Sequence, residues 1–109
     1  MAFVHTIAQA YAQRGMRPDA AFSVAQITPA LLSNPRARIT ARQMELVSGH
    51  AMRELDDEAL GGFSRRLPWG SYGMLARASI SSVHLRQALW RWCRHHHLLT
   101  DDIRVVVRE

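Results

Sequence analysis

The chain has 109 residues, a formal net charge of +5 and hydrophobic residues at 48% of its positions. This length supports one domain with a modest core, and the apolar fraction excludes a disordered chain. Its apolar runs are much shorter than the roughly 18 residues that a membrane helix needs, and we find no signal peptide at the N-terminus. The single cysteine excludes an internal disulfide and predicts a reducing, cytoplasmic location.

All 14 basic residues are arginine, and they are dispersed among nine acidic residues. A surface that binds nucleic acid normally needs clustered positive charge. Arginine in place of lysine is also typical of a GC-rich genome. An arginine-rich module that binds nucleic acid is therefore kept as an alternative function.

The first third of the chain predicts three helical segments. Apolar residues recur at helical spacing from Ala2 to Arg14, and Gly15 is well placed to end that helix. Pro18 begins a second short segment. Thr28 and Pro29 predict an N-cap and the first residue of a single helical turn.

The clearest helix is predicted from Thr40 to Leu55. Thr40 and Gln43 have the spacing of a capping box, in which each side chain bonds to the other's backbone amide. Met44, Val47, Ala51 and Leu55 form one apolar stripe, which we expect to face the core.

The second half predicts two further helices. A turn is expected at Pro68-Trp69-Gly70, a helix at 72–80 and a second helix at 83–98, capped by the hydroxyls of Ser81 and Ser82. The stripe expected to be buried on this last helix comprises Leu85, Ala88, Leu89, Trp92, His96 and Leu99.

The β-branched residues of Ile103–Arg108 favour a C-terminal strand. Such a strand needs a partner, which would be a missing segment, a second copy or an unrecognised extended segment. The predicted fold is thus one α+β domain over 1–109, predominantly α-helical, with a small bundle of about five helices and a C-terminal β-strand.

The sequence gives little support for a catalytic site or a metal site. Adjacent histidines at 95–97 point about 100° apart on a helix, so they cannot face one ion. No nucleophile elbow is present, and a solvated helix end explains the acidic cluster of Asp56, Asp57 and Glu58. We therefore expect no enzyme activity, no metal and no cofactor.

Aromatic and arginine side chains are the better candidates for recognition. Aromatic rings with a polar edge suit ligand pockets and interfaces. Trp90 lies four residues from an arginine on either side, which favours cation–π stacking or a subunit contact. The candidate ligand or interface residues are Trp69, Tyr72, Arg86, Trp90 and Arg94.

Several turns and helices resemble, in order and spacing, the N-terminal effector-sensing half of AraC-type transcription regulators. The segments that carry this resemblance are Leu31-Leu32-Ser33-Asn34-Pro35, Arg38-Ile39-Thr40, Asp56-Asp57-Glu58-Ala59-Leu60-Gly61, Pro68-Trp69-Gly70-Ser71-Tyr72-Gly73-Met74-Leu75, and the set Ser81-Ser82, Leu85, Ala88-Leu89, His96 and Leu98-Leu99.

The resemblance implies a bacterial, cytoplasmic regulator that binds a small-molecule effector and forms a homodimer. It also implies DNA binding only through a C-terminal domain that this sequence lacks, so the chain is expected to be the N-terminal part of a truncated sensor. A protein–protein adaptor that uses the open strand is a further alternative.

Overall fold

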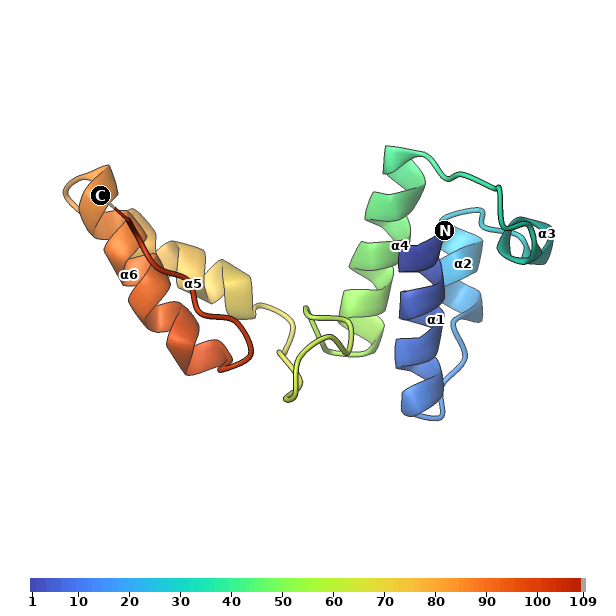
Figure 1. Ribbon diagram of the computed structural model, residues 1–109, viewed down its shortest axis with the longest axis horizontal. Coiled ribbons are helices and arrows are strands. Elements are labelled where there is room, and N and C mark those ends of the chain that lie inside the picture. Colours follow the sequence, from blue (N-terminus) through green and yellow to red (C-terminus); the bar gives the residue numbers. More distant parts are fainter. Residues whose placement is uncertain (109) are drawn as a thin grey trace.

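The computed structural model describes residues 1–108, and this part of the chain contains six helices and no β-sheet (Figure 1). The helices are α1 (Ala2–Gln13), α2 (Asp19–Val24), α3 (Pro29–Ser33), α4 (Ala41–Glu54), α5 (Ser71–Ile80) and α6 (Leu85–Leu99). None of them is long and apolar enough to cross a membrane.

The helices form two groups along an elongated molecule (Figure 1). Helix α4 packs against α1 and α2, while α5 packs against α6. The Cα radius of gyration is 16.5 Å, compared with about 13 Å for a compact domain of this length. We call α1–α4 the N-terminal lobe, α5 and α6 the helical hairpin, and residues 56–70 the linker.

The main hydrophobic core lies in the N-terminal lobe. Val4, Ile7 and Tyr11 of α1 are completely buried, and they pack in one cluster with Val47 and Ala51 of α4. The stripe predicted on α4 is therefore confirmed, although Met44 at its start is only half-buried. Burial of these side chains fixes α1 against α4, since each fully buried aliphatic side chain contributes about 1.5–3 kcal/mol.

Side-chain caps begin α3 and α4 as the sequence predicts. The Thr28 hydroxyl accepts a hydrogen bond from the Leu31 amide at 3.3 Å. At α4 the capping box is complete, because Thr40 and Gln43 each accept from the other's amide, at 3.1 and 2.9 Å. The Gln43 amide group also donates to the Ala25 carbonyl at 3.3 Å, which ties the end of α2 to α4.

The hairpin buries much less apolar surface than the lobe. Leu75 is buried between its helices, but Leu85 and Leu89 of the predicted stripe are 73% and 44% exposed. The predicted serine cap of α6 is also wrong, because His84 occupies the N-cap position and its Nδ1 accepts from the Gln87 amide at 3.2 Å.

The predicted C-terminal β-strand, and with it the α+β class, is wrong for the described residues. The segment 103–108 is extended and runs back along the hairpin (Figure 1), where Val107 lies beside Leu85 and Leu89. Its backbone makes no hydrogen bond with another described segment. β-Branched residues favour an extended chain, but a strand forms only where a second extended segment supplies hydrogen bonds.

Candidate functional site

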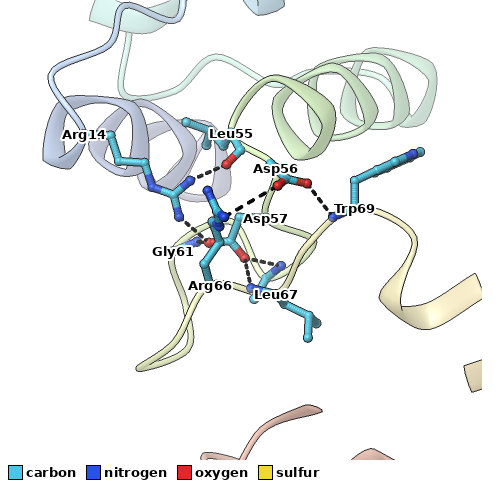
Figure 2. Close-up of polar contacts among 9 residues, drawn as sticks. Arg14, Leu55, Asp56, Asp57, Gly61, Arg66, Leu67 and Trp69 are labelled. Atoms are coloured by element: carbon cyan, nitrogen blue, oxygen red, sulfur yellow. Dashed lines mark hydrogen bonds and ion pairs between the residues drawn. The ribbon is translucent and has the colours of Figure 1, made fainter. Parts of the chain in front are cut away.

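A buried carboxylate at the start of the linker joins the linker to the N-terminal lobe (Figure 2). Asp57 is 1% exposed and accepts four hydrogen bonds. Its Oδ1 accepts from the amides of Ala59 and Leu67 at 3.0 and 3.1 Å. Its Oδ2 accepts from the Gly61 amide and the Arg14 guanidinium, both at 3.0 Å.

Arg14 extends this network to the ends of two helices. It is the C-cap residue of α1, and its second terminal nitrogen, Nη1, donates to the carbonyl of Leu55, the C-cap residue of α4. Positive charge is favourable at a helix C-terminus because the last carbonyls lack intrahelical partners. We call Arg14, Leu55 and Asp57, with the three amides that Asp57 accepts from, the Asp57 hub.

The backbone around the hub can be formed only by particular residues. Gly61 has φ +77°, and a Cβ atom built there would lie 3.2 Å from the Cβ of Ala10 in α1. Asp56 and Leu60 also have positive φ, near 50°, which is unfavourable for residues with a side chain. The hydrogen bonds that Asp57 accepts stabilise this turn despite the unfavourable φ angles.

The two neighbouring acids continue the network toward the hairpin. The Asp56 carboxylate accepts from the Trp69 amide at 2.9 Å and lies 3.7 Å from the Arg66 guanidinium (Figure 2). The Glu58 carboxylate accepts from the Tyr72 amide, at 2.8 Å, in the first turn of α5. The solvated helix end predicted for this acidic cluster is therefore wrong, because Asp57 is buried and all three carboxylates accept backbone amides.

A second contact fastens the linker to the far end of the hairpin. The amide and hydroxyl of Ser64 both donate to Asp102, each at 2.6 Å, and these bonds lower the pKa of the Asp102 carboxyl. Arg65 donates to the carbonyl of Leu99 at 3.3 Å. The linker thus contacts both the beginning of α5 and the end of α6.

The five predicted recognition residues lie in three places. Trp69 is on the linker, where the Arg53 guanidinium stacks on its ring at 4.9 Å. Tyr72 lies inside the hairpin, 6.1 Å from the stacked ring of Trp92, and its hydroxyl lies 3.1 Å from His96 Nε2. Arg86, Trp90 and Arg94 are exposed on α6. They do not converge on one pocket.

A groove that sequence reasoning missed lies in the N-terminal lobe, between α1, α2 and α3. Its volume is about 780 Å³, within the range of roughly 300–1,000 Å³ that is usual for small-molecule sites. The lining residues are Ala8, Pro18, Asp19, Phe22, Ser23, Gln26, Ile27, Thr28, Pro29 and Leu32. One sequence signal indicated this groove, which is that two short helices follow one another closely. Two short helices cover the adjacent helix only in part.

The groove combines an apolar floor with a few polar groups. Phe22 and Ile27 are buried beneath it, whereas Asp19, Ser23 and Thr28 are exposed along it. Gln26, with φ +57°, turns the chain from α2 toward α3. This lining suits a ligand with an apolar body and a small number of hydrogen-bonding groups.

The comparisons place the chain in a family. Residues 15–109 match the sequence profile of the arabinose-binding domain of AraC transcription regulators, an N-terminal domain. The chain belongs to this family. The comparisons with curated proteins and with solved structures give no match. The acidic cluster, the Pro68 turn and α6 all lie within the matched residues, whereas all of α1 precedes them.

We predict that Asp57→Asn lowers the free energy of unfolding by about 3 kcal/mol. In either orientation the substituted side chain places its NH2 group against two donors, which are the Gly61 amide and Arg14 or the amides of Ala59 and Leu67, and it removes the charge that Arg14 pairs with. Urea denaturation followed by circular dichroism measures the change.

Asp56→Asn is the matched control for this experiment. Asp56 is half-exposed, and Asn retains a carbonyl oxygen for the Trp69 amide, so we expect a loss below about 1 kcal/mol. Equal losses for the two adjacent substitutions would contradict a special role for Asp57.

Both tyrosines are predicted to ionise above the usual tyrosine range. Burial and the neighbouring Glu58 raise the pKa of Tyr72, and burial and Glu54 raise the pKa of Tyr11. Because the unfolded chain loses these protons first, stability is retained below about pH 10 and falls as the pH rises further. Absorbance at 295 nm measures the titration, and Glu58→Gln should lower the pKa of Tyr72 only. Tyrosines that titrate normally in the folded chain would contradict the prediction.

Proposed function

We propose that this domain senses a small effector, which binds in the groove between α1, α2 and α3. The observation that carries the proposal is the family match over residues 15–109, because the family is described as a ligand-binding domain of transcription regulators. The groove supports it, since its volume and mainly apolar lining suit a small molecule. We expect the parent regulator to act in the bacterial cytoplasm.

The effector acts, in this proposal, through the linker. The groove lies in the N-terminal lobe, and the Asp57 hub fixes the ends of α1 and α4 where the chain leaves that lobe. A ligand that contacts α1 and α2 can therefore bias the orientation of the hairpin, provided that it binds one arrangement more tightly than the other.

The lining also bears on the chemistry of the effector. A free sugar needs many hydrogen-bonding partners, because each buried hydroxyl without one costs about 1–3 kcal/mol. The floor made by Phe22 and Ile27 offers none from its side chains. We therefore favour an effector with an apolar body over L-arabinose.

Ser23→Phe is predicted to weaken ligand binding at least tenfold. Ser23 is exposed and lines the groove, so a phenyl ring there occupies the ligand's space without disturbing the core. Binding of the apolar probe 8-anilinonaphthalene-1-sulfonate by fluorescence, and of L-arabinose by calorimetry, measures the effect.

Ala20→Phe provides the matched control for the groove experiment. Ala20 is exposed on the same helix but does not line the groove, so binding of the probe should not change. An unchanged affinity in Ser23→Phe would exclude the groove as the site. Tight binding of L-arabinose would contradict the preference for an apolar ligand.

Dimerisation is the second function that we propose, at the end of the hairpin where α5 turns into α6. Ile80, Val83 and Leu85 are 78%, 89% and 73% exposed there. Neighbouring exposed apolar side chains are typical of interfaces rather than of a monomer's free surface. A second copy of the domain would cover them.

Val83→Ser is predicted to raise the dimer dissociation constant roughly tenfold, because it removes apolar area from the centre of this surface. Sedimentation equilibrium over a range of protein concentrations measures the constant. Val24→Ser changes a half-exposed valine in the N-terminal lobe and should have no effect. A monomer at every concentration would exclude this mode of assembly.

A further inference from the structure

Positive charge is denser in the last third of the chain than in the rest. Residues 71–109 contain six arginines and three acidic residues, a net charge of +3, whereas residues 1–70 contain eight arginines and six acidic residues, a net charge of +2. One of the three acidic residues, Asp102, is already hydrogen-bonded to Ser64. The helical hairpin and the segment after it therefore carry a net positive charge.

Helix α6 presents two of these arginines on one face. It contains three arginines and three histidines and no acidic residue. Arg86, Trp90, Arg94 and His97 are all exposed, and we call these four residues the α6 stripe. At 100° per residue they lie within about 80° of one another, opposite the face formed by Ala88, Trp92 and His96.

One contact within the stripe is a cation–π interaction. The Arg86 guanidinium stacks on the Trp90 ring at 4.8 Å, and Trp90 is itself 52% exposed. Arg91 lies outside the stripe, where it donates to the Ser81 hydroxyl at 3.2 Å. Within residues 1–108, no carboxylate forms an ion pair with Arg94.

We propose that the α6 stripe binds the phosphate backbone of duplex DNA. Arginine is the side chain best suited to phosphate, because its planar guanidinium donates two parallel hydrogen bonds. Arg86 and Arg94 are two turns apart, about 12 Å along the helix axis, a distance that spans several phosphates of one strand. The contact carries no sequence specificity, since phosphates are the same at every base pair.

Duplex DNA is favoured over an acidic protein because it presents a phosphate about every 3.4 Å of helix axis along each strand. Two arginines about 12 Å apart can therefore meet phosphates at many positions along a duplex, whereas an acidic protein would need carboxylates at one matching spacing. This inference does not depend on the effector groove.

The test uses fluorescence anisotropy of the 109-residue chain with a labelled duplex of about 20 base pairs and arbitrary sequence. Arg86→Gln/Arg94→Gln is expected to weaken binding at least tenfold at low salt. The slope of log affinity against log salt should fall by about 2, because each phosphate contact contributes about 0.9. Circular dichroism checks that the variant remains folded.

The matched control is Arg36→Gln/Arg38→Gln, which removes the same formal charge from exposed positions between α3 and α4. It should change affinity and salt slope much less. Equal effects of the two double variants would overturn the proposal, because binding would then follow net charge alone. It would also be overturned by no binding at about 50 mM salt and 100 µM protein, or by tighter binding to polyglutamate than to DNA.

Discussion

The ion pair between Arg14 and Asp57 is the interaction on which the arrangement of this domain depends. Arg14 lies at the end of α1, and it contacts both Leu55 at the end of α4 and Asp57 at the start of the linker, 41 and 43 residues further along the sequence. Asp57 is fully buried, and all four of its hydrogen bonds are needed because an uncompensated buried charge is strongly unfavourable. The direction in which the chain leaves the N-terminal lobe follows from this requirement.

The two halves of the molecule are stabilised by different means. The N-terminal lobe has a hydrophobic core, whereas the hairpin leaves large apolar side chains exposed and is attached through polar contacts at Glu58 and Asp102. Such a division suits a sensor, because hydrogen bonds at a linker can be rearranged more easily than a packed core. The groove lies in the well-packed lobe, and the proposed dimer and DNA surfaces lie on the hairpin.

Local sequence patterns predicted the helices well but not the strand. The capping box at Thr40 and the cap at Thr28 use atoms within three residues of one another, so spacing alone specifies them. The segment 103–108 was predicted as a strand from its valines, but a strand also requires hydrogen bonds from a distant segment. The apolar face predicted on α6 is only partly buried for the same reason, since its burial depends on which other segments pack against it.

The sequence by itself determined the helical segments, most of their ends and the resemblance to a regulator's sensor, because these depend on residue types at fixed short spacings. Only the tertiary structure decided the role of Asp57, the position of the groove and the separation of the five predicted recognition residues. Asp56, Asp57 and Glu58 are equivalent in a sequence pattern, and they differ only in which distant donors the fold brings to each. The groove likewise exists only because three helices meet at particular angles, which periodicity does not specify.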